Sequence, residues 1–330
     1  MKIFRFFFLI LHLLLLLMLL GVLLNAYVPP RRFAWFNLLS LGFPVIIILY
    51  SLLTLVWIFL KKKRAVFFIL LGLLFINPVR RWINFSLEKK EIANLKIVTL
   101  NTKGGKFGAD KIEKFVNEQH PDLVFLQEDG DIVYDFSDLK RNSKIYVVSL
   151  YSRYEVVAHK ELFEGLYSED FNAYADYTDL QIRDKTYRII NLYLQPFKFE
   201  KQMVKLNGNS KEDEQKVKNI VKRLIPTFKA HQEQVNIIRN AIDESPYPVI
   251  VAGDFNSAPN SYEYYHLGNG LKDAFMEAGN GSATSFHEYK FPIRIDYIFT
   301  SPSIKALSYK VDRSQKLSDH FPVVATFKID

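Results

Sequence analysis

Long apolar runs near the amino terminus constrain this chain most. Residues 4–24 are apolar apart from one arginine and one histidine, and residues 36–60 form a second run. Each meets the ~20 residues that a helix needs to cross a bilayer. A third run, residues 65–84, is strongly apolar only over roughly its first dozen residues, and its polar end suits the membrane interface. We therefore predict a membrane anchor over residues 1–91 with about three transmembrane helices.

A cleaved secretory signal is the main alternative for the first run. Lys2 and Arg5 resemble the charged start of such a signal. The run is, however, longer than an ordinary signal core, lacks a small-residue cleavage site at its end, and precedes a second apolar segment. These features favour a retained multi-pass anchor.

The net charge of +8 belongs to the predicted anchor. Residues 1–91 hold 12 Lys and Arg residues against two acidic ones, whereas the remainder holds 31 against 33. Basic clusters beside apolar runs are typical of segments that meet lipid headgroups. The slightly acidic remainder lacks the basic surface of proteins that bind long nucleic-acid duplexes. The absence of cysteine excludes disulfides, thiol catalysis and a Cys-ligated zinc site.

The positive-inside rule predicts the side of the membrane on which the large domain lies. Placing the amino terminus and the basic residues 61–64 in the cytoplasm puts residues 92–330 outside after three spans. Two further basic pairs, residues 80–81 and 89–90, then lie on the unexpected side. We therefore predict that the large domain is extracytoplasmic, although the positions of these two basic pairs argue against this orientation.

From residue 92 onward, short apolar runs alternate with polar segments and two helical patterns. Residues 110–119 form one amphipathic pattern and residues 217–243 another, in which Pro226 is expected to kink or divide the helix. Residues 207–215 are interpreted as a loop or a helix start. The spacing of the runs favours antiparallel pairing, at least in part, and predicts two packed sheets covered by helices. The expected strands are residues 95–100, 123–126, 144–150, 155–159, 173–182, 188–194, the run from residue 249, and residues 294–299, 306–311 and 323–328.

Polar residues follow, interrupt or directly precede five of these apolar runs, and this recurrence is the main functional signal. Asp254 and Asn256 stand two residues apart at the end of the run from Val249, so an extended backbone would point both side chains the same way. A carboxylate and an amide in one place suit work on a phosphate, which needs a hard cation and hydrogen-bond donors. The other members of the set are Asn101, Glu128, Asp296 and the neighbours Asp319 and His320.

The motifs come in one order along the chain: Asn101, residues 122–128, Gly-Asp-Phe-Asn at 253–256, Arg-Ile-Asp-Tyr at 294–297 and Ser-Asp-His at 318–320. Together they resemble the endonuclease/exonuclease/phosphatase superfamily of metal-dependent phosphohydrolases. The similarity covers residues 95–330, and residues 239–265 resemble a membrane-anchored bacterial branch. It implies an α/β (α+β) fold, a four-layer αββα sandwich of two mixed sheets, for a catalytic domain over residues 92–330.

The resemblance also implies a role for each polar residue. Asp254 would activate or position the attacking water, and Asn256 would donate a hydrogen bond to a phosphate oxygen. His320, held by Asp296, would bind the phosphate as imidazolium. Mg²⁺ or Mn²⁺ would lie near Glu128, Asp319 and Asn101, and Asn101 could also contact the phosphate.

Simpler interpretations stay open for each motif on its own. A carboxylate at a strand end, such as Glu128, is commonly a helix cap or a surface group. Residues 253–256 and the segment after Asn101 both have compositions that favour turns. An adjacent Asp and His, such as Asp319 and His320, are often ordinary surface residues. Arg294 could be structural or could face the substrate.

Two positions depart from the family pattern. Many members have a histidine where Tyr193 stands, and tyrosine, which titrates at about pH 10, is a poorer proton shuttle at neutral pH. Members similar to apurinic endonucleases have tyrosine in the comparable role, so Tyr193 is kept as a candidate catalytic residue. Lys103 stands where some members have an acidic residue, which could reduce the metal content to one ion.

The sequence therefore predicts a membrane-anchored, Mg²⁺- or Mn²⁺-dependent phosphoesterase that uses in-line attack by water. Its substrate would be a phosphate ester of a lipid, an inositol phosphate or a nucleic acid, and membrane lipids would contact its N-terminal helices. No obligate protein partner is expected. The alternative is a catalytically inactive binding or scaffold protein that keeps the fold, as Tyr193 hints. A transporter is disfavoured because the predicted spans lack internal charges.

Overall fold

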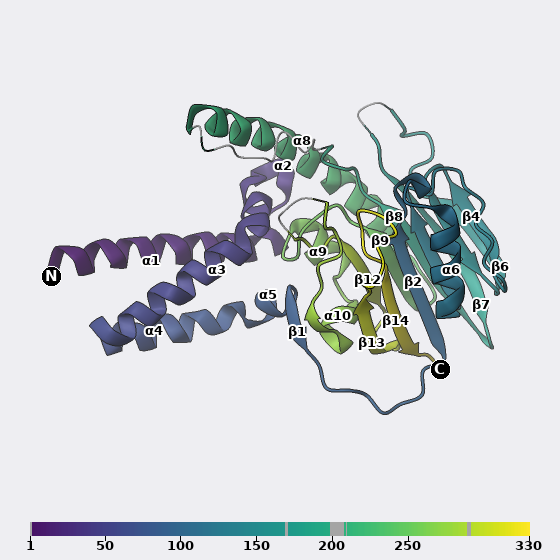
Figure 1. Cartoon of the computed structure of the whole chain (residues 1–330), viewed down its shortest axis with the longest axis horizontal. Coiled ribbons are helices and arrows are strands. Elements are labelled where there is room, and N and C mark those ends of the chain that lie inside the picture. Colours follow the sequence, from purple (N-terminus) through teal and green to yellow (C-terminus); the bar gives the residue numbers. More distant parts are fainter. Residues whose placement is uncertain (1, 169–170, 199–207, 209, 289–291) are drawn as a thin grey trace.

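Two six-stranded sheets form the body of the molecule (Figure 1). The computed structural model describes residues 2–168, 171–198, 208, 210–288 and 292–330. The first sheet has the order β13 (Lys305–Val311), β14 (Val323–Lys328), β2 (Leu95–Asn101), β3 (Leu123–Gln127), β5 (Val148–Ser152) and β4 (Lys140–Ile145). The second has the order β10 (Lys272–Asp273), β12 (Asp296–Thr300), β9 (Val249–Asp254), β8 (Lys185–Tyr193), β7 (Tyr174–Ile182) and β6 (Glu155–Glu161). Strands β2 and β3 are parallel, as are β8 and β9, and the other neighbours in these two sheets, as far as described, are antiparallel.

Helices cover the outer face of each sheet and make four layers (Figure 1). On the first sheet, Phe115 of α6 (Ala109–Gln119) shares a core with Val98. On the second, Ile238 of α8 (Ser210–Asp243) shares another with Val251, while Ile97 belongs to the core between the sheets. Neighbouring residues such as Ile97 and Val98 are thus buried on opposite faces, which explains why the central strands are apolar throughout. The predicted four-layer sandwich of two mixed sheets is confirmed.

Two predicted elements differ from those observed. Where the sequence predicts one strand over residues 144–150, the chain forms the hairpin β4–β5, with Tyr146 in the left-handed region at φ 47°. No glycine or asparagine marks this turn, so the apolar pattern conceals it. Pro226 does not divide α8, which is one helix of 34 residues. The proline lies at an exposed position of this helix. The interpreted loop or helix start at residues 207–215 lies partly outside the described residues, and α8 starts at Ser210.

The amino-terminal helices project from one side of the sandwich (Figure 1). Helices α1 (Lys2–Leu23) and α3 (Trp35–Leu60) pack together, and each belongs to a segment long and apolar enough to cross a membrane by length and composition. The third expected span corresponds to α4 (Lys62–Gly72), η2 (Leu73–Phe75) and α5 (Ile76–Arg80), and it stays a prediction. The remaining described elements are short. They are η1 (Leu24–Ala26), α2 (Pro30–Phe33), η3 (Lys103–Gly105), α9 (Tyr262–Leu267), α10 (Ala274–Ala278) and the paired strands β1 (Ile83–Phe85) and β11 (Asn280–Ser282).

A buried carboxylate joins helix α3 to the sandwich. Asn37 Nδ2 lies 2.8 and 3.1 Å from the two carboxylate oxygens of Glu263, and Asn37 Oδ1 accepts a hydrogen bond from the Tyr262 amide at 2.7 Å. His231 Nδ1 lies 2.7 Å from Glu263 Oε1. The side chains of Asn37, His231 and Glu263 are completely buried. One hydrogen-bonded cluster therefore connects α3, α9 and α8.

The basic pair at residues 80–81 also contacts the sandwich. The Arg81 guanidinium lies over the Tyr264 ring at 4.5 Å and donates to Asn260 Oδ1 at 2.8 Å. Arg80 donates to the Met276 carbonyl at 3.2 Å. These contacts give a structural function to two charges that the positive-inside rule leaves unexplained.

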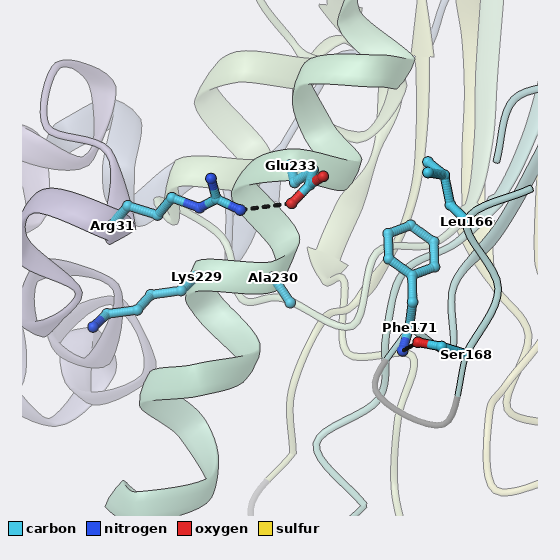
Figure 2. A pocket seen from close by; sticks show the side chains of 7 residues that line it. All are labelled: Arg31, Leu166, Ser168, Phe171, Lys229, Ala230 and Glu233. Carbon is cyan, nitrogen blue, oxygen red and sulfur yellow. Dashed lines mark hydrogen bonds and ion pairs between the residues drawn. The ribbon is translucent and has the colours of Figure 1, made fainter.

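The short helix α2 contacts α8 in a similar way. Arg31 Nη2 lies 2.6 Å from Glu233 Oε2, and the Arg31 amide donates to Gln232 Oε1 at 2.8 Å. Beside this ion pair, a hollow of about 370 Å³ separates α8 from the loop that carries Leu166 and Phe171 (Figure 2). None of the residues predicted for the functional site lines this hollow.

Candidate active site

Strand register brings three predicted residues side by side at one edge of the second sheet. Tyr193 pairs with Asp254 across β8 and β9, and Asp254 pairs with Asp296 across β9 and β12. Gly253 has a φ of 143°, and a Cβ atom there would lie 2.0 Å from the Leu192 carbonyl oxygen. The glycine of the Gly-Asp-Phe-Asn motif is therefore required for the close packing of β8 and β9 next to Asp254.

Asn101 connects the two sheets at the same edge. Its Nδ2 donates to Glu128 Oε1 at 3.0 Å and to Asp254 Oδ2 at 3.1 Å. The Tyr193 hydroxyl donates to the same Glu128 oxygen at 2.9 Å. Burial, together with the charges of Glu128 and Asp254, raises the pKa of Tyr193 well above its ordinary value, so the hydroxyl keeps its proton. Four predicted residues from four strand ends thus share one network.

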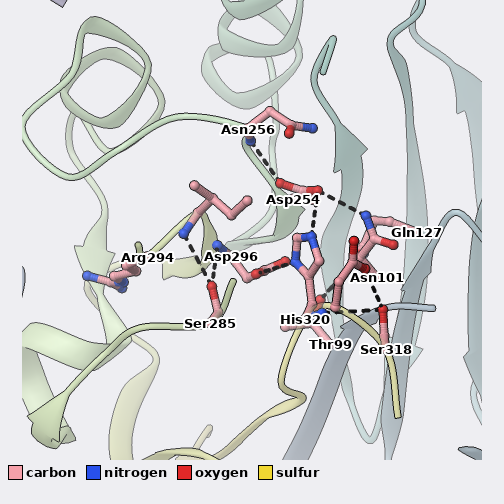
Figure 3. A network of polar contacts seen from close by, with 12 residues as sticks. Thr99, Asn101, Gln127, Asp254, Asn256, Ser285, Arg294, Asp296, Ser318 and His320 are labelled. Carbon is pink, nitrogen blue, oxygen red and sulfur yellow. Dashed lines mark hydrogen bonds and ion pairs between the residues drawn. The ribbon is translucent and has the colours of Figure 1, made fainter. Parts of the chain in front are cut away.

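His320 and Asp296 form a buried pair next to Asp254 (Figure 3). His320 Nδ1 lies 2.8 Å from Asp296 Oδ2, and its Nε2 lies 3.8 Å from Asp254 Oδ2. None of the three side chains is more than 5% exposed. Burial alone would lower the pKa of His320, but the charges of Asp296 and Asp254 outweigh this effect and raise the pKa to about 10. His320 is therefore an imidazolium at neutral pH.

The same surroundings make Asp254 a weak acid. Burial raises the pKa of Asp254 to about 8, against the opposing charge of His320. Its Oδ1 accepts a hydrogen bond from the Asn256 amide at 2.8 Å. The raised pKa makes the ionised form of Asp254 a stronger base toward water than a free aspartate.

Asn256 lies at the rim and does not point in the direction of Asp254. The chain turns at Asn256, where φ is 45°, and its Nδ2 donates to the Leu194 carbonyl at 2.8 Å. In Figure 3 Asn256 and the His320 ring lie on opposite sides of Asp254. The extended backbone on which a common direction depends does not continue to Asn256, because β9 ends at Asp254.

Asp319 is paired with a lysine. Lys103 Nζ lies 2.5 Å from Asp319 Oδ2 and 3.7 Å from Glu288 Oε2. Burial alone would lower the pKa of Lys103, but the hydrogen bond and charge of Asp319 outweigh it and raise this pKa. A cation at Asp319 would therefore compete with an ammonium group that is already in place.

Comparison with known proteins decides the family. Residues 98–320, more than half of the chain, match the Endonuclease/Exonuclease/phosphatase family. The chain belongs to this family. Its members are hydrolases that act on phosphate esters, and they generally depend on divalent metals. Residues 5–82 match a separate domain of unknown function, DUF8431. A search of curated proteins found no significant match.

Solved structures show the same fold at low sequence identity. An endonuclease/exonuclease/phosphatase from Bacteroides vulgatus is 18% identical, with 72% of this chain and 99% of that chain covered and a TM-score of 0.50. A family protein from Bacteroides thetaiotaomicron is 16% identical, with 73% and 100% covered and a TM-score of 0.51. A functionally unknown conserved protein from Enterococcus faecalis V583 is 13% identical, with 72% and 100% covered and a TM-score of 0.52.

Glu128 offers this family member a position for a hard cation. Its Oε1 accepts two hydrogen bonds, whereas no hydrogen bond from the described residues reaches Oε2. An open carboxylate oxygen suits Mg²⁺, which binds one or two carboxylates together with water. Asp254, Asp296 and His320 also bring one ligand atom each within 4.8 Å of one another, but His320 Nδ1 already contacts Asp296 Oδ2 at 2.8 Å and Asp254 Oδ2 accepts a hydrogen bond from Asn101. The residues therefore fit an ion beside Glu128 better than one in the buried triad.

Two buried amides below the site escape the sequence analysis. Gln127 Nε2 donates to Asn191 Oδ1 at 2.8 Å, and Asn191 Nδ2 donates to the Ser149 carbonyl at 2.9 Å. Neither amide is more than 1% exposed. They connect β3 to β8 next to Glu128 and Tyr193. The sequence feature that could have identified them is a polar residue inside an otherwise apolar strand, one or two positions before a predicted site residue.

Arg294 proves to be structural. Its buried guanidinium donates to both carboxylate oxygens of Asp273, at 2.6 and 2.7 Å, and to the Arg81 carbonyl at 3.2 Å. Asp273 also accepts a hydrogen bond from the Tyr264 hydroxyl at 2.8 Å. Arg294 therefore supports the junction with the anchor.

Proposed function

We propose that this protein is a membrane-anchored phosphoesterase that depends on Mg²⁺ or Mn²⁺ and uses direct attack by water. The observation that carries the proposal is the arrangement of Asp254 between the Asp296 and His320 pair and the Asn101 link to Glu128. An inactive scaffold would not need a buried imidazolium held beside a carboxylate that titrates near neutrality, because buried charges are costly to a fold.

Each residue of the network has a separate task in this proposal. Asp254 accepts a proton from the attacking water, and His320 places a positive charge where a phosphate oxygen gains negative charge. Asp296 holds the His320 ring and its proton through the Nδ1 contact. Asn101 orients the Asp254 and Glu128 carboxylates without adding charge. Tyr193 donates to Glu128 and acts as a positioning residue.

A metal ion would be held by Glu128, and it would supply positive charge to the phosphate and to the water that attacks it. We assign no metal to Asp319 because Lys103 occupies its carboxylate. The rotated Asn256 side chain lies at the rim, and we assign it to the substrate rather than to the water.

Removing the metal is expected to abolish hydrolysis by the full chain in detergent. The measurement is the rate on a bis-aryl phosphodiester with Mg²⁺ or Mn²⁺ and then with excess chelator. Glu128→Gln should weaken metal binding, measured by calorimetry, by about tenfold or more. The matched control is Glu164→Gln, at an exposed position on the loop after β6. Full activity in chelator would refute the proposed mechanism.

The side of the membrane is part of the proposal. The basic pair at residues 80–81 contacts the sandwich, so we leave it out of the positive-inside comparison. The basic residues at the amino terminus and at 61–64 then favour the cytoplasm for themselves and the outside for the catalytic domain. The resemblance of residues 239–265 to a membrane-anchored bacterial branch supports the anchor and carries no information on its side. The natural chain has no cysteine, so a single introduced cysteine can report the side.

Labelling of intact cells with a membrane-impermeant maleimide gives the test of orientation. Glu164→Cys, on the catalytic domain, should be labelled before cell lysis. Lys62→Cys, at the exposed start of α4, should be labelled only after lysis. The reverse pattern would place the catalytic domain in the cytoplasm.

A further inference from the structure

Four tyrosines form a continuous series of rings next to the proposed site, and we call them the tyrosine stack: Tyr146, Tyr167, Tyr174 and Tyr193. Tyr174 and Tyr193 are cross-strand partners on β7 and β8, with ring centroids 6.4 Å apart and ring planes 22° apart. Tyr167 lies 5.2 Å from Tyr174 with its plane rotated by 24°. Tyr146 contacts Tyr167 at 4.7 Å and Tyr174 at 5.1 Å. The rings therefore lead from β8 to the tip of the β4–β5 hairpin.

The inner end of the tyrosine stack belongs to the site. The Tyr193 hydroxyl donates to Glu128 Oε1, the carboxylate to which we assign the metal. Tyr193 is only 4% exposed, and Tyr174 is half-buried beside it. A group bound along the stack would therefore lie close to a phosphate held at Glu128.

The outer end is exposed and adopts an unfavourable backbone conformation. Tyr146 is 57% exposed and stands in the β4–β5 turn at φ 47°. Glycine and asparagine adopt this conformation readily, whereas a bulky residue is strained in it. The ring contacts Tyr167 and Tyr174 on one side, but more than half of the residue faces solvent. Strain at an exposed residue next to a site is a reason to look for a function.

We propose that the tyrosine stack binds a ring in the alcohol part of the phosphate ester. This inference rests on the proposed phosphoesterase activity and specifies its substrate class. Aromatic faces bind nucleobases by stacking and present a flat apolar surface to the C–H face of a sugar. The stack would thus select small esters of nucleosides or sugars over esters of acyclic alcohols. The slightly acidic composition of residues 92–330 fits a small ligand better than a long duplex.

The test compares esters with and without a ring, using the full chain in detergent. We would measure kcat and KM for a nucleoside 5′-monophosphate, a hexose 6-phosphate and glycerol phosphate, with a bis-aryl phosphodiester as the activity reference. Tyr146→Gly removes the ring and relieves the turn, whereas Tyr146→Phe keeps the ring. Tyr146→Gly should raise KM about tenfold for a ring-bearing ester and leave KM for glycerol phosphate unchanged, and Tyr146→Phe should behave like the wild type. Glycine relieves the strain at this φ but loses the ring contacts with Tyr167 and Tyr174, so the Tm of Tyr146→Gly should change little.

Each result has a distinct meaning. A higher KM for the nucleotide alone assigns the stack to nucleobases, and a higher KM for both ring-bearing esters assigns it to sugar rings. Equal changes for all three esters, or no change, would overturn the proposal, as would hydrolysis of the reference without hydrolysis of either ring-bearing ester. No hydrolysis of any ester, including the reference, would instead refute the phosphoesterase activity itself.

Discussion

Asp254→Asn is expected to lower kcat by about 10²–10⁴-fold, the usual contribution of a positioned general base. The Asp254 carboxylate is buried, and its raised pKa, about 8, makes its ionised form a stronger base toward water than a free aspartate. Asparagine fills nearly the same space and can still accept one hydrogen bond, but it cannot accept that proton. The measurement is the hydrolysis rate of the full chain on a bis-aryl phosphodiester at saturating metal.

The same substitution should change how stability depends on pH. The pKa of Asp254 in the folded protein, about 8, lies above the value of about 4 for an unfolded aspartate. The folded state therefore binds the additional proton between these values, and this group costs the wild type stability as pH rises from about 4 to about 8. Asparagine does not ionise, so the Tm of the variant relative to the wild type should increase over this range.

Asp176→Asn is the matched control for Asp254→Asn. Asp176 is a buried carboxylate on β7 of the same sheet, and it contacts His159 Nε2 at 3.0 Å. Its replacement should leave kcat near the wild-type value. An equal loss of activity in both variants would point to general damage of the sheet, and a wild-type rate for Asp254→Asn would remove Asp254 from the mechanism.

The fold was predictable where burial on two faces imposes a simple pattern. Strand β2 is apolar because Ile97 and Val98 face different cores, and the same holds for the central strands of both sheets. Elements defined by tertiary contacts were not predictable. Helix α9 carries Glu263, which in the sequence resembles a surface residue but is buried against Asn37 and His231.

The sequence predicts which residues form the candidate site, but it does not predict where their side chains point. Asn101, Asp254 and Glu128 come together because each ends or follows a strand, and strand register determines which ends are neighbours. The turn at Asn256 and the Lys103 contact of Asp319 depend on loop conformations that residue spacing does not encode. The roles of these residues therefore stay predictions, and the variants above test them.

Asn37→Leu is expected to lower the free energy of unfolding by about 3–5 kcal/mol, the usual cost of breaking a buried polar pair that includes a charge. Leucine would remove two hydrogen bonds from the buried Glu263 carboxylate and the acceptor of the Tyr262 amide. The interaction with His231 would remain, but it cannot replace those donors. Thermal unfolding of the full chain in detergent measures the loss. The domain over residues 92–330 should also be less stable alone, because it lacks Asn37.

Asn77→Leu makes the same chemical change at an exposed position of α5, and it should alter stability by no more than about 0.5 kcal/mol. Equal Tm values for the two variants would show that the Asn37 cluster does not hold the anchor to the sandwich.

Loss of the Asn37 cluster should also change the position of Asn256 at the candidate active site. His231 Nε2 lies 2.7 Å from the Gln195 carbonyl, and the preceding carbonyl, of Leu194, fixes Asn256. Asn37→Leu should therefore lower activity below its melting range, while Asn77→Leu should not.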